Sequence, residues 1–171
     1  MTSDPSPAAA HRARAPRSAV CWAVTISDTK TEADDRSGAL IHDALAAAGH
    51  EVRGRRLVPD DPERIRGAIL EGIDAGAQAV ITTGGTGLTA RDSTYEVVSA
   101  LIERPIPGFG ELFRMLSWQE VRAAAMLSRA TAGVVRGAVV FALPGSSKGV
   151  DLALRELIIP ELGHVLEQLA R

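Results

Sequence analysis

The stretch that decides the fold is Ala79-Val80-Ile81-Thr82-Thr83-Gly84-Gly85-Thr86-Gly87-Leu88-Thr89-Ala90-Arg91-Asp92-Ser93-Thr94-Tyr95-Glu96. It begins with a short apolar, β-branched run that is typical of a buried strand. Glycines dominate residues 84–87, where the backbone can adopt conformations closed to other residues and a ligand can approach closely. Ser93 and Glu96 form a capping-box pattern, which predicts a helix from there to about Glu103. The stretch therefore predicts a strand, a glycine-rich loop and a helix N-terminus in succession.

This arrangement predicts an anion site, because free N–H groups and the positive end of a helix face one point. The helix dipole contributes about 0.3–1 kcal/mol near the surface, so the loop's hydrogen bonds must supply most of the affinity. Arg91 can pair with a phosphate, and Asp92 can hold a hard cation such as Mg²⁺ or position a nucleophile. The alternative is a strand-to-helix turn in which glycine merely saves space.

Two named nucleotide-binding motifs do not fit the loop. A P-loop needs Gly-Lys-Ser/Thr after its glycines, and that sequence is absent from this stretch. Residues 85–90 match the dinucleotide fingerprint, but the acid expected at the end of the next strand is missing, since Glu103 ends a predicted helix. A Rossmann-type enzyme is therefore disfavoured.

Composition places the chain among globular α/β proteins. At 171 residues it is long enough for one domain with a proper core, and it is 46% hydrophobic with few aromatics. The net charge of −2 gives no reason to expect a nucleic-acid partner. The single cysteine, Cys21, excludes an internal disulfide framework, and we expect a buried thiol in a cytoplasmic protein. The four histidines have no ligand spacing, so we infer no zinc site.

Outside the quoted stretch, the sequence predicts a tail and a domain. Residues 1–18 are expected to form a disordered, mildly basic tail, and no run reaches the length of a membrane span. In the domain, 19–171, strands alternate with helices at first, which calls for a parallel sheet with right-handed crossovers. The expected strands are 19–26, 51–58 and 79–83, with a hairpin of 132–135 and 138–143 turning at Arg136-Gly137. The expected helices are 39–48, 63–75, 93–103, 112–116, a second capping-box helix from Ser117 to about Leu127, one ending at Ile159 and one beginning or kinking at Pro160, with a shaped loop over 104–111.

Polar residues follow several predicted strands, at the edge where open α/β sheets bind ligands. Ser27-Asp28 follow the first strand. Asp61-Pro62 has the form of an N-cap and first helical residue, which leaves Asp60 as either a functional residue or a solvated turn residue. Pro144-Gly145-Ser146-Ser147-Lys148-Gly149 is a second candidate phosphate loop. Two such loops with acids between them predict a ligand with more than one phosphoryl group, bound with the help of a metal ion.

Taken together, these loops resemble those of the MoaB/Mog family of molybdenum-cofactor biosynthesis proteins. The resemblance covers about Val20 to Leu166, and residues 34–38 and 113–117 look more like the MoaB branch. It implies a three-layer α/β/α sandwich with a mostly parallel sheet and a β-hairpin, assembled as a trimer or, in the MoaB branch, sometimes a hexamer. The motifs that carry it, in the family's order, are Ser27-Asp28, 34–38, 82–92, Pro107-Gly108-Phe109-Gly110-Glu111, 113–117, Ser128-Arg129 and 143–146.

The resemblance also implies an activity, molybdopterin adenylyltransferase. The terminal phosphate of molybdopterin attacks the α-phosphorus of Mg-ATP and releases pyrophosphate, and the adenylylated product passes to a downstream protein for molybdate insertion. The family's functional aspartates fall on Asp60 and Asp92, implied as catalytic residues and as ligands of Mg²⁺. The other positions implied to bind molybdopterin or the nucleotide are Ser27, Asp28, Thr83, Gly84, Gly85, Thr86, Gly87, Arg91, Glu111, Ser128, Arg129, Pro144, Gly145, Ser146 and Lys148.

The chain departs from the family's pattern at three positions. Ala90, Tyr95 and Ser147 stand where the family often has proline, and losing a proline relaxes a loop by some tenths of a kcal/mol to about one. Tyr95 is expected to alter the fit of a ligand. Because some MoaB-branch proteins lack the transferase activity, a non-catalytic molybdopterin carrier of the same fold is the alternative function.

Overall fold

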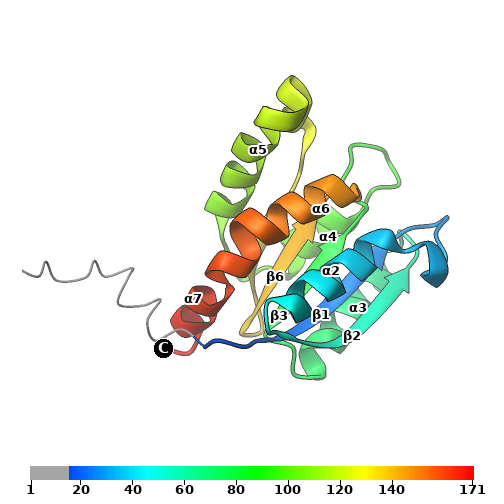
Figure 1. The fold of residues 1–171 in the computed structure, drawn as a ribbon. Coiled ribbons are helices and arrows are strands. Elements are labelled where there is room, and N and C mark those ends of the chain that lie inside the picture. Colours follow the sequence, from blue (N-terminus) through cyan, green and yellow to red (C-terminus); the bar gives the residue numbers. More distant parts are fainter. Residues whose placement is uncertain (1–15) are drawn as a thin grey trace, which may run out of the picture.

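A computed structural model describes residues 16–171 of the chain. One six-stranded sheet, in the order β2-β1-β3-β6-β5-β4, lies between helices (Figure 1). Its strands are β1 (Val20–Ile26), β2 (Glu51–Val58), β3 (Ala79–Thr83), β4 (Arg104–Pro105), β5 (Thr131–Val135) and β6 (Ala138–Leu143). The tail expected at 1–18 lies outside the described residues except for 16–18, which are exposed.

Helices connect these strands, and within residues 16–171 none of them is long and apolar enough to cross a membrane. The α-helices are α2 (Arg36–Ala47), α3 (Pro62–Asp74), α4 (Thr94–Leu101), α5 (Pro107–Val121), α6 (Ser147–Ala153) and α7 (Ile159–Leu169). The shorter helical turns are η1 (Glu32–Asp34), η2 (Arg122–Leu127) and the π-helical η3 (Leu154–Ile158), which joins α6 to α7.

The direction of the strands brings the predicted site residues to one edge. β1 runs parallel to β2 and β3, and β3 runs parallel to β6, so these four strands end at the same edge of the sheet. β5 is antiparallel to β6, and its first residue therefore lies at that edge as well. The turn between them, at Arg136 and Gly137, has positive φ at both residues, as the favoured two-residue hairpin turns require. The predicted hairpin and mostly parallel sheet are confirmed.

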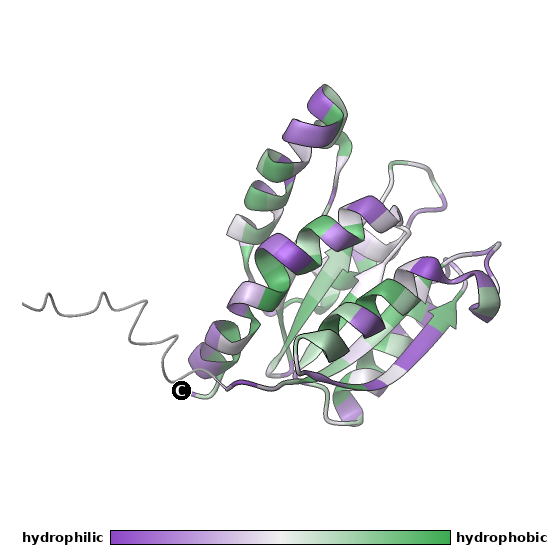
Figure 2. Cartoon of the chain, viewed as in Figure 1, coloured by the Kyte–Doolittle hydropathy of each residue, from purple (hydrophilic) through white to green (hydrophobic). Residues whose placement is uncertain are grey.

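Alternate residues of β1 point into two separate cores. Cys21 and Ala23 pack with apolar residues of α2, α5, α6 and α7, whereas Trp22 and Val24 pack with residues of α3 and α4. The central strands β1, β3 and β6 are accordingly hydrophobic along their length, whereas β2 at the edge carries polar side chains (Figure 2). Burial raises the pKa of the Cys21 thiol to about 12, which fits the buried role expected for it. The predicted three-layer sandwich is thus confirmed.

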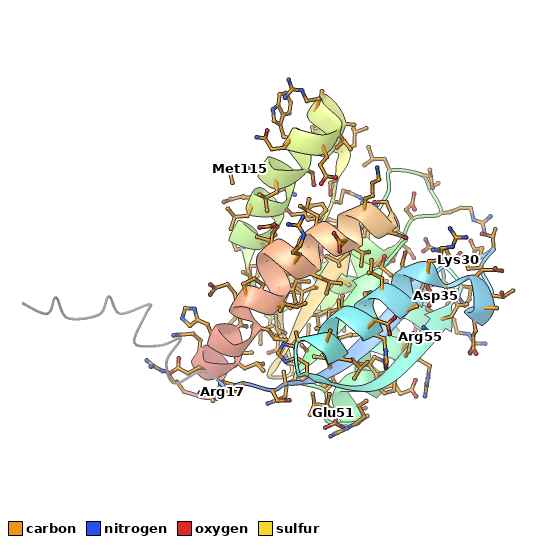
Figure 3. All side chains as sticks on the ribbon, viewed as in Figure 1. Arg17, Lys30, Asp35, Glu51, Arg55 and Met115 are labelled. Carbon is orange, nitrogen blue, oxygen red and sulfur yellow. The ribbon has the colours of Figure 1, made fainter. Side chains whose placement is uncertain are left out.

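The first helix begins earlier than its apolar pattern indicated. Asp35 caps α2, since its Oδ1 accepts the Gly38 N–H at 2.9 Å, and its Oδ2 accepts the Thr25 hydroxyl at 2.9 Å. The Asp35 side chain is almost fully buried, and Arg55 Nε lies 3.9 Å from its Oδ2 (Figure 3). The helix therefore begins at Arg36 rather than Ala39, because a buried N-cap satisfies its first turn.

The segment after Glu103 is the part of the fold that was predicted wrongly. The expected loop over 104–111 and the two expected helices are instead the short edge strand β4 and one continuous helix, α5. Pro107 is tolerated because it occupies the first turn, and Gly110 lets α5 approach the Ala130 carbonyl, 2.6 Å from where a Cβ would lie. Ser117 is a buried residue within α5, not an N-cap.

A tight contact around Trp22 offers a test of the packing on the α3 side. A Cβ added at Gly54 or Gly72 would lie 2.1 Å or 2.5 Å from an atom of the Trp22 side chain, so both glycines admit the indole. We expect Gly72→Ala to lower the free energy of unfolding by about 1–3 kcal/mol, since overpacking outweighs the gain in helix propensity. Chemical denaturation measures this quantity.

Gly67→Ala, in the exposed middle of the same helix, is the matched control. Nothing lies within 4 Å of its Cβ position, so the variant should be more stable by up to about 1 kcal/mol. Equal effects of the two substitutions would contradict the packing described here.

Candidate active site at the carboxyl edge of the sheet

The glycine loop lies against the ends of three strands. Gly84 has a φ of +100°, and a Cβ there would lie 2.2 Å from the Ile26 carbonyl oxygen at the end of β1. The Gly84 N–H donates to the Leu143 carbonyl at 3.1 Å, and the Thr83 hydroxyl donates to the Pro144 carbonyl at 2.9 Å. Only glycine fits position 84, because both the φ and the close approach exclude a side chain. The turn therefore joins β1, β3 and the loop after β6.

Asp60 reaches the loop from the end of β2. Its Oδ1 accepts two hydrogen bonds from Ser93, from the N–H at 3.1 Å and from the hydroxyl at 2.7 Å. Its own N–H donates to Asp28 Oδ1 at 3.1 Å, and a Cβ at Gly85 would lie 2.6 Å from Asp60 Oδ2. Within residues 16–171, Oδ2 accepts no hydrogen bond. Asp60 is half-buried, and its carboxylate is held through one oxygen. The carboxylate of a solvated turn residue would instead be exposed and bonded to water.

The same contacts correct the interpretation of Ser93 and Glu96 as a capping box. α4 does begin after Ser93, but the Ser93 side chain makes no capping bond and bonds Asp60 instead. Glu96 pairs with Arg129. The helix also ends at Leu101 instead of Glu103. Ser93 thus joins the candidate site through Asp60, a contact that the sequence did not predict, because a local motif explained Ser93 without a distant partner.

Asp92 is bound to its own loop. Its Oδ2 accepts the Thr89 N–H at 2.9 Å and the Thr89 hydroxyl at 2.6 Å, and a Cβ at Gly87 would lie 2.7 Å from Oδ2. The Thr89 hydroxyl is the main cause that lowers the pKa of Asp92, and the N–H groups of Thr89 and Gly87 and the charge of Arg129 act in the same direction. Asp92 is therefore ionised at neutral pH.

Two arginines flank the loop. Arg91 pairs with Asp28, with 2.5 Å between Nη2 and Oδ2, although its side chain is 76% exposed. Arg129 Nε donates to the Thr86 carbonyl at 3.1 Å, and its terminal nitrogens donate to the Gly87 carbonyl and the Glu96 carboxylate. The hydrogen bond from Arg129 is the main cause that lowers the pKa of Glu96. The ring of Tyr95 lies under the guanidinium, 4.9 Å from ring centre to Cζ.

The other predicted residues line neighbouring cavities. A cavity of about 470 Å³ between α5 and α6 is lined by Ser128 and the loop after β6, including Pro144, Ser146 and Lys148. The Ser146 hydroxyl caps α6 by accepting the Gly149 N–H at 3.2 Å. Lys148 is exposed, and within residues 16–171 no carboxylate pairs with it.

A second cavity, of about 430 Å³, is lined by Glu111, Arg114, Ser128, Arg129 and Tyr95, among others. A third, of about 330 Å³, contains Asp92 together with Arg129. Ser128 lines both the first and the second cavity, and Arg129 lines both the second and the third. Ser27 is set slightly apart, since its hydroxyl accepts the N–H groups of Thr29 and Lys30 in its own turn.

The carboxylates do not form a complete protein cage for a metal. Among the described residues, no group of three or more His, Cys, Asp or Glu side chains is placed to hold an ion. The free Oδ2 of Asp60 and the ionised Asp92 do fit Mg²⁺, which takes one or two carboxylates and completes its shell with waters and substrate phosphates.

Comparisons with known proteins agree with this geometry. A family described as "Probable molybdopterin binding domain" matches residues 22–164. "Molybdenum cofactor biosynthesis protein B" of Bacillus cereus is 50% identical over 163 residues, which cover 94% of this chain and 96% of that protein. A Pyrococcus furiosus protein named "Molybdopterin adenylyltransferase" is 42% identical, with 92% and 95% covered.

Solved structures give the same relationship. A crystal structure of a molybdenum cofactor biosynthesis protein B has a TM-score of 0.88 and 51% identity, and covers 92% of this chain and 99% of that one. The tungsten cofactor synthesizing protein MoaB from P. furiosus has a TM-score of 0.84 and 41% identity, covering 92% and 100%. With the fold, the loop geometry and these similarities in agreement, the chain belongs to the MoaB/Mog family of molybdenum-cofactor biosynthesis proteins.

Proposed function

We propose that this chain is a molybdopterin adenylyltransferase that uses Mg-ATP. A terminal phosphate oxygen of molybdopterin attacks the α-phosphorus of ATP, a new P–O–P bond forms, and the bond from the α-phosphorus to the β-bridging oxygen breaks. The products are adenylylated molybdopterin and pyrophosphate. The observation that carries the proposal is the convergence of Asp60 and Asp92 on the glycine loop, in a family that includes a named molybdopterin adenylyltransferase.

Phosphoryl transfer depends mainly on positioning and on the neutralisation of charge, and the loop is suited to both. Its N–H groups can bind phosphoryl oxygens, as at other glycine-rich turns before helices. Ser146 and Lys148 line the adjoining cavity of about 470 Å³ and can hold the second phosphorylated ligand there. The chain's own residues thus supply two phosphate positions side by side.

Asp60 and Asp92 are the residues proposed to hold Mg²⁺. When bound, the ion would neutralise charge on the phosphates. Ser93 fixes one oxygen of Asp60, and Thr89 fixes one oxygen of Asp92, so both carboxylates are oriented before a ligand arrives. This preparation favours an enzyme over the alternative, a carrier that binds molybdopterin without transfer.

We also propose that the chain forms a homo-oligomer through α5 and η2. α5 exposes an apolar side chain every third residue, and Met115 lies on its free side (Figure 3). Several large apolar side chains exposed on one helix and the turn after it are typical of an interaction surface. The family resemblance implies that a second copy of this chain covers the exposed apolar side chains. The exposed residues are Leu112, Met115, Trp118, Val121, Met126 and Leu127.

The transferase assignment is tested by removing one carboxylate charge at a time. We expect Asp60→Asn and Asp92→Asn each to lower molybdopterin-dependent pyrophosphate release on the order of 10²–10³-fold, as for other losses of preorganised charge at a reacting phosphate. Calorimetric titration should show that molybdopterin still binds.

Asp61→Asn is the matched control for this pair of variants. It removes the same charge from the adjacent residue, and asparagine serves as well as aspartate at the N-cap of α3, where Asp61 Oδ1 accepts the Arg64 N–H. Tight molybdopterin binding without pyrophosphate release by the wild-type protein would establish the carrier instead.

A further expected outcome concerns Thr89 and the ionisation of Asp92. Thr89→Val removes the hydroxyl that contributes most to the lowered pKa of Asp92, so that pKa should rise towards its ordinary value. A lowered folded-state pKa stabilises the fold above the unfolded-state pKa, and this contribution is lost as pH falls through the folded-state value. The variant should therefore have less of this stabilisation above the unfolded-state pKa, and its activity should fall at a higher pH than that of the wild type as Asp92 is protonated.

Carboxyl-carbon NMR titration measures the pKa of Asp92 directly. Glu96 serves as the comparison and should move less than Asp92, because the hydrogen bond from Arg129 is the main cause of its lowered pKa and Asp92 acts on it only through its charge. An unmoved Asp92 in the Thr89→Val protein would show that the hydroxyl does not control it.

Self-association is tested with Met115→Glu. An unpaired charge buried in an interface costs about 3–5 kcal/mol, so the subunit dissociation constant should rise at least about 100-fold. Light scattering after gel filtration measures the mass. Arg66→Glu, an exposed charge change on α3, should leave the mass unchanged. A monomeric wild-type protein, or an unchanged Met115→Glu mass, would refute the interface.

A further inference from the structure

Arg129 was expected to bind a phosphate, yet its guanidinium is already engaged. Its polar partners are the two loop carbonyls of Thr86 and Gly87 and the carboxylate of Glu96. Glu96 neutralises its charge, and the Tyr95 ring covers one of its faces. The side chain is only 20% exposed. An incoming phosphate would have to displace these partners in order to reach it.

The direction of the loop's peptide groups shows what these contacts achieve. All peptide bonds in the described residues are trans, so each carbonyl points opposite to the N–H of the next residue. With the carbonyls of Thr86 and Gly87 turned towards Arg129, the N–H groups of Gly87 and Leu88 are turned away from it. The Gly87 N–H faces the Asp92 carboxylate, whose pKa it lowers, which leaves the Leu88 N–H for a ligand. The Gly85 carbonyl is likewise held, by the Thr94 N–H at 2.9 Å. Three consecutive carbonyls are thus fixed.

A loop of this composition needs such an external restraint. Glycines at 84, 85 and 87 allow the peptide planes to rotate at little cost, and a rotated plane would place a carbonyl oxygen where a phosphate oxygen binds. Arginine suits this task, because its planar fork has donors for two carbonyls and a carboxylate at once, which a lysine ammonium cannot match in the same geometry.

We propose that Arg129 is a positioning residue. With Tyr95 and Glu96 it forms a clamp that holds the carbonyls of Thr86 and Gly87 away from the phosphate. The loop can then present N–H groups to the phosphate. The catalytic consequence rests on the proposed function, whereas the restraint itself does not.

The restraint is tested without any ligand, by hydrogen exchange of the full-length protein. In Arg129→Lys, amides of residues 86–92 should exchange about tenfold faster than in the wild type. Tyr95→Leu should give a smaller increase, about threefold, because only the stacking is lost. Arg136→Lys, in the distant hairpin turn, is the matched control and should match the wild type. Melting curves establish that each variant is folded.

Kinetics then separates the clamp from a direct phosphate contact. Loss of the clamp should raise the KM for Mg-ATP about tenfold in Arg129→Lys with a smaller change in kcat, although the charge is retained. Wild-type exchange rates over 86–92 in Arg129→Lys would overturn the clamp, even if the wild type is an active transferase. Faster exchange in a protein that releases no pyrophosphate would leave the clamp standing and refute the proposed function instead.

Discussion

The close approach of Gly84 to the Ile26 carbonyl is the constraint on which the site depends. The backbone there has a φ of +100°, and a side chain would lie 2.2 Å from that oxygen. This contact lets the loop after β3 cross the end of β1. Asp28 and Asp60 are in contact at the same place, because the Asp60 N–H donates to the Asp28 carboxylate. It also brings the loop beside the chain that leaves β6, through the Gly84 N–H and the Thr83 hydroxyl. The parallel strands thus deliver four separate segments to one place, and glycine allows them to touch.

The loop is held by residues that are distant in sequence. Asp60 fixes Ser93 at the start of α4, and Arg129 holds the carbonyls that precede it. Two carboxylates beside a phosphate site would repel the ligand if they were uncompensated, since like charges disfavour one another at close range. Two arginines near the loop offer positive charge: Arg91 pairs with Asp28, and the charge of Arg129 helps to lower the pKa of Asp92.

The sequence predicted the central strands β1, β3 and β6 well, because they are short apolar runs whose side chains are buried in the two cores. It predicted the convergence of Asp60 and the glycine loop for a geometric reason, since parallel strands end at one edge. It failed over residues 104–121, where Pro107 and Gly110 look like loop residues but are needed for a first helical turn and a close contact. It failed at Ser93 and Glu96 too, because a short-range motif concealed their partners Asp60 and Arg129. Contacts between distant segments leave no periodicity in a single chain.

The central claim is that the loop N–H groups bind the phosphates that react. A crystal structure of the protein with molybdopterin and an ATP analogue whose α–β bridge cannot be cleaved tests this most directly. We predict phosphoryl oxygens within hydrogen-bonding distance of the N–H groups of Gly85, Thr86 and Leu88, with Arg129 still bonded to the Thr86 and Gly87 carbonyls. Phosphates bound away from this loop, or bound through Arg129 itself, would contradict it.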